Sequence, residues 1–445
     1  MNFAIVRYLI GWMLGIESIF LLLPALTAVI YGEPELPAYL IAAAISLAGA
    51  ALLCHRKPKN TRFYAREGYV TVALCWLILA VIGALPFVLS REIPFFIDAL
   101  FETVSGFTTT GATILGDVEA LSHASMLWRC LTHWVGGMGV LVFMLIVLPL
   151  AGGQTIFLMR AESPGPSVSK MSPRMRDTAT ILYAIYFGLT VLQMILLLIG
   201  GMPFFDAICV SLGTAGTGGF GNWNDSIAHY NSAYLQNVIT VFMILFGINF
   251  SAYFLILTRK FRQAFRIEEI RVYLGVIFVF AGLIAFNVRP MFGSLRESFH
   301  HALFQVASII TTTGFSTVDF DQWPTFSRAL LVLLMFIGAC AGSTGGGIKC
   351  SRILLLGKSV KKELMCLIHP RLVRVNKMDG QRVPHEVMRS INVFVVAYAF
   401  IFILSLLIIS LNCEDLVTCF TSVATTLNNV GPGLSLCLSL IHISE

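Results

Sequence analysis

Four short segments of the sequence share a length, a pattern of small residues and a glycine in the last place. They read DALFETVSGFTTTG (98–111), DAICVSLGTAGTGG (206–219), HALFQVASIITTTG (301–314) and TCFTSVATTLNNVG (418–431). Glycine permits a left-handed backbone, and the threonines before it supply hydroxyl groups without a formal charge. A turn of this composition can present backbone carbonyl oxygens, the ligands that replace the hydration shell of a monovalent cation in a selectivity filter.

The length of these segments predicts how each is held in a membrane. Thirteen residues before the glycine give about nine helical residues and a short extended strand, and nine residues at about 1.5 Å each reach halfway through a bilayer. Non-helical backbone at that depth is tolerated only where it is buried in protein or lines a water-filled cavity. One such turn is usually a packing feature, but four copies in phase favour a shared cation pathway, towards which the negative ends of the half-helix dipoles would point.

The composition of the whole chain indicates an integral membrane protein. The 445 residues are 57% hydrophobic and 12% charged, whereas a soluble globular protein is about 25% charged. The first apolar run lacks a small-residue cleavage site and is followed by further runs, so we expect an anchor that is retained. Nine crossings of a bilayer core of about 30 Å are predicted, at residues 8–31, 37–54, 69–90, 124–150, 179–202, 234–258, 272–289, 326–357 and 391–411.

Basic residues cluster between these runs. Residues 55–67, 154–178, 259–271 and 358–390 hold 5, 4, 5 and 8 of the 30 Lys and Arg. The positive-inside rule places all four segments in the cytoplasm, so the net charge of +6 reports topology and not a nucleic-acid-binding face. The ten cysteines include no Cys-x-x-Cys pair and indicate neither a disulfide framework nor a zinc site.

A second glycine-rich stretch, GACAGSTGGGIKCS at 338–351, interrupts the run at 326–357 with five glycines. A continuous helix is not expected there. We interpret the stretch as a flexible intramembrane loop under the third turn and no other, which blocks or clears a pore; a glycine-rich helix crossing is the alternative. The candidate gate residues are Gly338, Gly342, Ser343, Thr344, Gly345, Gly346, Gly347 and Lys349.

Isolated polar residues yield weaker expectations. Arg129 is expected to pair with an outer carboxylate, Glu102 or Asp117, and His123, His133, His300 and His301 are expected at the membrane interface. No carboxylate is expected within a span, which disfavours a proton-coupled transporter. No nucleophile with a histidine partner is found, and GTGGFG at 216–221 lacks the βαβ context of a dinucleotide site, so an enzyme is not expected.

Taken together, these motifs resemble those of the Trk-type potassium uptake family, TrkH branch, in the superfamily that includes KtrB and plant HKT transporters. The matching stretches are SGFTTTGAT (105–113), HWVGGMGV (133–140), MRAESPGP (159–166), ATILYAIYFGLT (179–190), TGGFG, TTTGFST, GACAGSTGGGIK and TLNNVGPG (426–433). The resemblance implies an all-α polytopic membrane protein with four pseudo-symmetric span, pore-loop and span repeats around a central pore, preceded by two extra helices.

The implied domains follow the chain in order. They are a two-helix extension (1–67), pore repeat 1 (68–178), pore repeat 2 (179–271), pore repeat 3 with the gate loop 338–351 (272–390) and an incomplete pore repeat 4 (391–445). The run SLCLSLIHISE at the end does not resemble the last span of the family. We therefore expect a truncated reading frame in which residues after about 434 are not native and the last span is missing.

The function implied by the resemblance is potassium-selective, channel-like uptake across the bacterial inner membrane. Potassium would be the transported ion, with no covalently bound cofactor; the partners would be a second copy of the chain, a cytoplasmic TrkA-type nucleotide-binding regulatory subunit and membrane lipid, but no nucleic acid. A sodium- or proton-coupled potassium symporter is the alternative, as is a non-conducting fragment. The filter carbonyls would belong to Thr109, Thr110, Gly111, Thr217, Gly218, Gly219, Thr312, Thr313, Gly314, Asn429, Val430 and Gly431.

Overall fold

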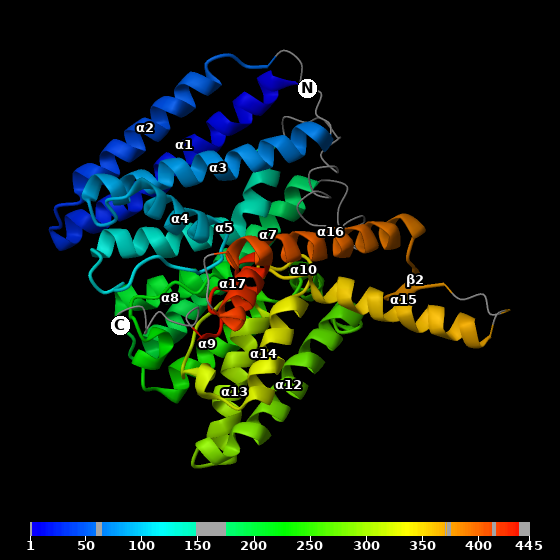
Figure 1. Ribbon diagram of the computed structural model, residues 1–445. Helices are drawn as coiled ribbons and strands as arrows, with labels where there is room; N and C mark the ends of the chain where they lie inside the picture. Colours follow the sequence, from blue (N-terminus) through cyan, green and yellow to red (C-terminus); the bar gives the residue numbers. More distant parts are fainter. Residues whose placement is uncertain are drawn as a thin grey trace. The chain divides into compact units, whose positions relative to one another are not determined.

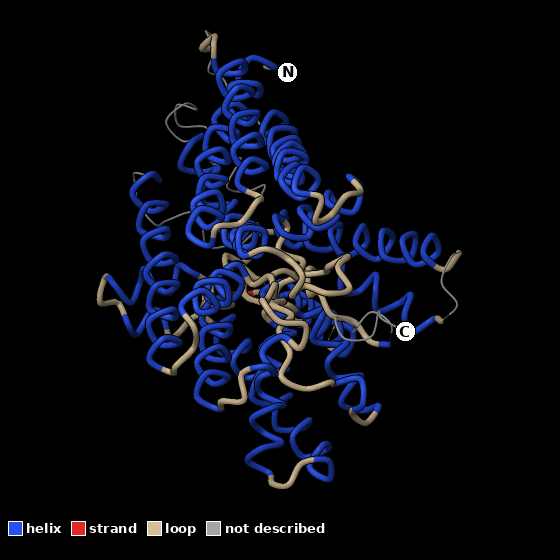
Figure 2. Tube along the Cα trace, turned by 90° about the vertical axis from the view of Figure 1, so that its left-hand side faces the viewer, coloured by secondary structure: helices blue, strands red, loops and turns tan. Residues whose placement is uncertain are grey.

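The computed structural model describes residues 2–58, 65–147, 175–369, 371, 375–411 and 415–435. Nearly all regular structure in this part of the chain is α-helical (Figure 2), and the exception is a hairpin of two short antiparallel strands, β1 (Lys377–Met378) and β2 (Gln381–Arg382). The described residues divide into two compact units, one of residues up to His229 and the other of residues from Tyr230 onwards.

The first unit begins with three long helices that lie side by side (Figure 1). Small residues allow α1 and α2 to approach closely, as is common between membrane helices: a Cβ atom added at Gly11 would lie 2.6 Å from the Sγ atom of Cys54. The helices of this unit are α1 (Phe3–Tyr31), α2 (Leu36–Cys54), α3 (Ala65–Ser90), α4 (Phe96–Phe107), α5 (His123–Val147), α7 (Met175–Ile199), α8 (Phe204–Gly216) and the 3₁₀ turn Ser226–His229.

The second unit is built around α12, α13 and α14, which also lie side by side (Figure 1). Their buried aliphatic side chains, among them Ile277, Ile309 and Leu334, form one core. The helices are α9 (Ala233–Phe246), α10 (Phe250–Leu257), α11 (Phe261–Ala264), α12 (Glu268–Val288), α13 (Leu295–Ile310), α14 (Thr325–Ile337), α15 (Cys350–Ile368), α16 (His385–Ile409) and α17 (Leu416–Asn428), with 3₁₀ turns at Arg289–Met291 and Phe320–Gln322.

In the part of the chain that the structure describes, each of the nine predicted apolar runs lies largely on helices, but the runs do not all form unbroken spans. Among the described residues, six helices are long and apolar enough to cross a membrane: α1, α2, α3, α7, α12 and α16. The run at 234–258, predicted as one span, is instead the pair α9 and α10, bent by 92°. Gly247 lies at the break because a Cβ atom there would lie 2.3 Å from the hydroxyl of Tyr273. The predicted interruption of 326–357 is confirmed, since α14 ends at Ile337 and α15 begins at Cys350.

Candidate ion-conduction site

The similarity of the four glycine-ended segments extends to their backbone. Each contains the C-terminal part of a short helix, α4, α8, α13 or α17, of 12, 13, 16 and 13 residues. These helices begin before the segments, and 10 or 11 residues of each segment are helical, against the predicted nine or so. The twelfth residue of each segment has positive φ, and so does the closing glycine, while the residue between them does not. These angles are 59° and 78° at Thr109 and Gly111, 54° and 80° at Thr217 and Gly219, 60° and 86° at Thr312 and Gly314, and 58° and 90° at Asn429 and Gly431.

The same hydrogen bond closes all four turns. The carbonyl oxygen of the eighth residue accepts from the backbone N–H of the thirteenth, at 2.9 Å (Ser105 and Thr110), 3.0 Å (Gly213 and Gly218), 2.9 Å (Ser308 and Thr313) and 2.8 Å (Thr425 and Val430). The sign of φ also alternates over three consecutive residues of each turn, unlike the uniformly extended backbone of a β-strand.

Within each unit, the glycine of one turn lies against the carbonyl group of the next. In the first unit, a Cβ atom added at Gly111 would lie 1.9 Å from the carbonyl oxygen of Gly218. In the second unit, a Cβ atom added at Gly314 would lie 2.6 Å from the carbonyl oxygen of Val430. The two turns of each unit are thus packed so closely that only glycine fits at these positions.

A buried ion pair supports the strand that follows the first turn. The Glu102 carboxylate accepts from the Nε–H of Arg129 at 2.6 Å, from the hydroxyl of Thr113 at 2.9 Å and from the backbone N–H of Ile114 at 3.1 Å. The Arg129 guanidinium also lies 4.1 Å from the centre of the Phe220 ring, just after the second turn. The predicted pairing of Arg129 with Glu102 is confirmed.

Asp117, the other carboxylate considered for Arg129, has a different partner. Its Oδ1 atom accepts from the side-chain amide of Asn224 at 2.8 Å, and the Asn224 Oδ1 atom accepts from the backbone N–H of Val118 at 2.9 Å. Donation by the Asn224 side chain, and then by the backbone of Glu119, lowers the pKa of Asp117 below its ordinary value. These contacts join the segments that follow the first and second turns.

The four histidines occupy different environments. His123 is half-exposed and its Nδ1 atom lies 2.8 Å from the carboxylate of Glu33. His133 is fully buried, and the interfacial prediction for it was wrong: its Nδ1 atom accepts from the backbone N–H of Phe220 at 3.3 Å, behind the second turn. His301 and His300 are partly buried and contact Thr317 at 3.1 Å and Gln236 at 2.7 Å.

The intramembrane loop, residues 338–349, lies against the turns of the second unit. The backbone N–H of Gly346 donates to the Thr312 hydroxyl at 2.6 Å, and the backbone N–H of Gly347 donates to the Asn428 carbonyl at 3.0 Å. A Cβ atom added at Gly345 would lie 2.7 Å from the carbonyl oxygen of Thr311. The loop therefore contacts the fourth segment as well as the third, which corrects the prediction that it lies under the third turn alone.

Of the other candidate gate residues, Gly338 and Gly342 have positive φ, 70° and 74°, and allow the chain to reverse. The Ser343 hydroxyl donates to the Cys340 carbonyl at 2.6 Å, and the Thr344 hydroxyl donates to the Phe246 carbonyl at 3.3 Å. The ammonium group of Lys349 donates back to the Gly345 carbonyl inside the loop.

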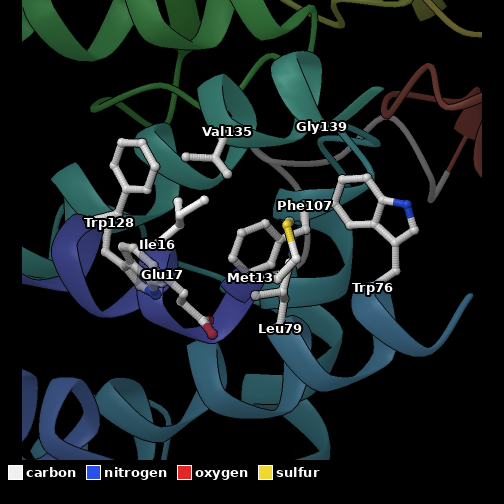
Figure 3. Close-up of a pocket in the computed structure, with 10 residues that line it drawn as sticks. Met13, Ile16, Glu17, Trp76, Leu79, Phe107, Trp128, Val135 and Gly139 are labelled. Atoms are coloured by element: carbon white, nitrogen blue, oxygen red, sulfur yellow. The ribbon is translucent and has the colours of Figure 1, made fainter. Parts of the chain in front are cut away.

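One buried carboxylate was missed in the sequence. Glu17 lies in the middle of α1 and is 3% exposed, so the expectation that no carboxylate lies within a span was wrong. Figure 3 shows its carboxylate among apolar and aromatic side chains, including Trp76, Phe107 and Trp128, which line a cavity of about 20 Å³, space for one water molecule. The Ser46 hydroxyl donates to Oε2 at 3.4 Å, while Oε1 has no hydrogen-bond partner among the described residues.

Apolar helices of membrane length, combined with half-helices that end in alternating-handed glycine turns, define a polytopic membrane protein of the pore-loop type. The chain belongs to the TrkH family of cation transport proteins, whose family model matches residues 37–281 and 276–443. It is therefore a multi-pass protein of the bacterial inner membrane, and the family and the all-α polytopic fold predicted from the sequence are confirmed.

Relatives match along nearly the whole chain. The chain is 38% identical to the "Trk system potassium uptake protein TrkH" of Salmonella typhimurium over 98% of its own length and 91% of that protein. It is 34% identical to the "Trk system potassium uptake protein TrkG" of Escherichia coli K12, over 96% and 90%. The crystal structure of the potassium transporter TrkH from Vibrio parahaemolyticus superposes with a TM-score of 0.88 at 31% identity, covering 98% of this chain and 92% of that one.

Part of the predicted organisation lies outside the described residues. This holds for most of the basic segment 154–178 and for residues 436–445, which include most of the run predicted to be non-native.

Proposed function

We propose that this chain carries potassium into the bacterial cell through a filter of backbone carbonyl groups. The observation that carries the proposal is the identical backbone of the four turns, with positive φ at the twelfth and fourteenth residues and the same closing hydrogen bond. Relatives named as potassium uptake proteins support the choice of ion. The proposed ligands are the carbonyl groups of Thr109, Thr110, Gly111, Thr217, Gly218, Gly219, Thr312, Thr313, Gly314, Asn429, Val430 and Gly431.

Electrostatics favours a cation at these turns without any charged side chain. Each turn follows the C-terminal end of its half-helix, where the helix dipole is negative. Carbonyl oxygens replace the hydration shell of a weakly hydrated cation such as potassium and leave it free to move between sites. The proposed transport needs no cofactor and no covalent step.

The intramembrane loop is the proposed gate. Its backbone is hydrogen-bonded to Thr312 and to Asn428, which belong to two of the four segments, so displacement of the loop alters the space beside both turns. A cytoplasmic TrkA-type nucleotide-binding subunit is the proposed regulator, and a homodimer is the proposed assembly. The domain boundaries 1–67, 68–178, 179–271, 272–390 and 391–445 belong to the same proposal.

Uptake of radioactive rubidium into liposomes that contain the purified chain tests the function. We expect an outward potassium gradient to drive rubidium into the liposomes. External potassium should inhibit this influx, and sodium at equal concentration should inhibit it little. In cells that lack potassium uptake, expression of the chain should restore growth at low potassium. Absence of flux, or equal competition by sodium, would contradict the proposal.

Glu17 favours a second candidate, proton-coupled potassium uptake. A carboxylate buried in the middle of an apolar helix, with no cationic partner among the described residues, is typical of proton relays. Its cavity is lined by Phe107, the last residue of α4 before the first turn. If uptake is proton-coupled, an inward proton gradient accelerates rubidium influx and Glu17→Gln removes that acceleration. A channel-like protein shows the same influx with and without the proton gradient.

A further inference from the structure

A single carboxylate holds both ends of the intramembrane loop. Glu269 is the second residue of α12 and is 3% exposed. Its Oε1 atom accepts from the backbone N–H of Ala341 at 2.7 Å and from the backbone N–H of Ser351 at 3.0 Å. Ala341 lies near the start of the loop and Ser351 lies just after its end, so one oxygen atom joins the entry of the loop to its exit.

These two hydrogen bonds lie at a narrow base, residues 338–341 beside 347–351, which we call the neck. There the backbone N–H of Cys350 donates to the Ala339 carbonyl at 3.0 Å, and a Cβ atom added at Gly338 would lie 2.9 Å from the Cα atom of Gly347. The remaining residues, 342–346, are the tip. The tip reaches the third turn through the Gly346 backbone, which donates to Thr312.

The neck and the tip are therefore held by different kinds of contact. The neck is fixed by a carboxylate, and hydrogen bonds to a charged acceptor are about twice as strong as those between neutral groups. The contacts of the tip with the third turn, α9 and α10 are neutral: Gly346 donates to the Thr312 hydroxyl, Thr344 donates to the Phe246 carbonyl, and the Gly342 carbonyl accepts from Phe250. The charged contact of the tip, from the Lys349 ammonium group to the Gly345 carbonyl, lies within the loop itself. The weaker set is the one expected to break first.

We propose that Glu269 is the positioning residue of the gate: it clamps the neck so that only the tip moves. This inference rests on the proposed role of the loop as the gate. Glu269 does not touch the transported ion and acts only through the backbone of the loop.

The neighbouring residue extends the clamp towards the cytoplasm. The ammonium group of Lys358 on α15 donates to the Glu268 carboxylate and, at 2.8 Å, to the Lys377 carbonyl in β1. The backbone N–H of Glu268 donates to the Oδ1 atom of Asp379 in the hairpin at 2.7 Å. Two consecutive residues of α12 thus contact the hairpin (Glu268) and the neck (Glu269). Movement of the hairpin would therefore be transmitted to the neck through one turn of α12.

The thiols of Cys340 and Cys350, both buried in the neck, report on the clamp directly. The full chain in liposomes is treated with a membrane-permeant thiol reagent, and labelling of each cysteine is followed by peptide mass spectrometry. Loss of a hydrogen bond to a charged group shifts an opening equilibrium by about tenfold or more. We expect Glu269→Ala to raise the labelling rate of both cysteines by about tenfold.

Two further variants distinguish whether Glu269 acts as a hydrogen-bond acceptor or only fills space. Glu269→Gln retains one oxygen at the same reach but loses the charge, so the labelling rate should rise clearly less than in Glu269→Ala. The matched control is Glu363→Gln on α15, whose side chain is 67% exposed. If Glu269→Ala does not fold, Glu269→Asp takes its place, since its shorter side chain cannot reach both N–H groups.

Rubidium influx in the same liposomes distinguishes the clamp from the proposed function. With both correct, Glu269→Ala raises basal influx and leaves the preference for potassium over sodium unchanged. Faster labelling without a change in influx supports the clamp and rejects the loop as the gate. Unchanged labelling in Glu269→Ala, or an equal rise in Glu269→Ala and Glu269→Gln, overturns the clamp whatever the flux.

Discussion

The Nε atom of Arg129 lies 2.6 Å from the Oε1 atom of Glu102, and both side chains are at most 1% exposed. This ion pair joins α5 to α4, the half-helix that leads into the first turn. Through Thr113 and Ile114, the same carboxylate holds the strand that leaves that turn. One buried ion pair thus holds both the half-helix that enters the first turn and the strand that leaves it.

Arg129→Met should lower the stability of the protein by about 3 kcal/mol, because removal of one partner leaves a buried charge uncompensated. Thermal unfolding in detergent measures the loss. Arg328→Met is the control: Arg328 and Asp321 form a pair at 3.2 Å with about a third of each side chain exposed, which is worth at most about 1 kcal/mol. Equal losses in the two variants would show that burial of the Arg129 pair is unimportant.

Gly111→Ala should reduce rubidium influx by about tenfold or more, because the added methyl group collides with the carbonyl group of Gly218 at a positive-φ position. Gly314→Ala and Gly314→Asp should act in the same way through Val430. Gly188→Ala on α7 is the matched control, since among the described residues no atom beyond its own helix turn lies within 4 Å of the added Cβ atom. Normal influx in Gly111→Ala would argue against a tightly packed filter.

Gly346→Ala should raise basal rubidium influx several-fold. Its Cβ atom would lie 2.5 Å from the Asn428 carbonyl oxygen, so the tip of the loop must move away from the turns. Gly357→Ala on α15, where nothing lies within 4 Å, should leave influx unchanged. A loss of influx in Gly346→Ala would indicate that the loop supports the turns and does not block them.

Asp415→Ala should lower the melting temperature at neutral pH and have no effect in strong acid. The Asp415 carboxylate caps α17 by accepting from the backbone N–H groups of Val417 and Thr418, and donation by Thr418 lowers its pKa. A group whose pKa is lower in the folded state stabilises above its unfolded pKa and loses that effect as the pH falls through the folded value. The difference between variant and wild type should therefore be full above the unfolded pKa of about 3.9 and vanish once the pH falls below the lowered folded value; a difference that does not depend on pH would contradict this.

The local sequence pattern was sufficient to predict the structure where the backbone geometry requires one residue type. The glycines at 111, 219, 314 and 431 identified the four turns because only glycine readily takes positive φ at such positions. The five glycines at 338–351 likewise predicted the interruption between α14 and α15. Glu17 was also visible in the sequence, but it was missed because the first apolar run was assessed by length and mean composition.

Other features depend on which atoms meet across the fold. The residues beside His133 in the sequence do not indicate whether its ring faces lipid, water or a neighbouring turn. Only the packing of the fold shows that it lies against Phe220. At the bend between α9 and α10, glycine is required at 247 because the hydroxyl of Tyr273 lies beside it, a contact between residues far apart in the chain.

By itself, the sequence determined the membrane setting, the family and the position of each turn, because hydrophobic length and glycine backbone preference are local properties. Only the tertiary structure decided what fixes those turns: it selected Glu102 over Asp117 as the partner of Arg129, and it placed Glu269 at the neck of the loop. A sequence leaves several partners open for a charged side chain, and one is selected when folding removes water from both groups and leaves each to satisfy the other.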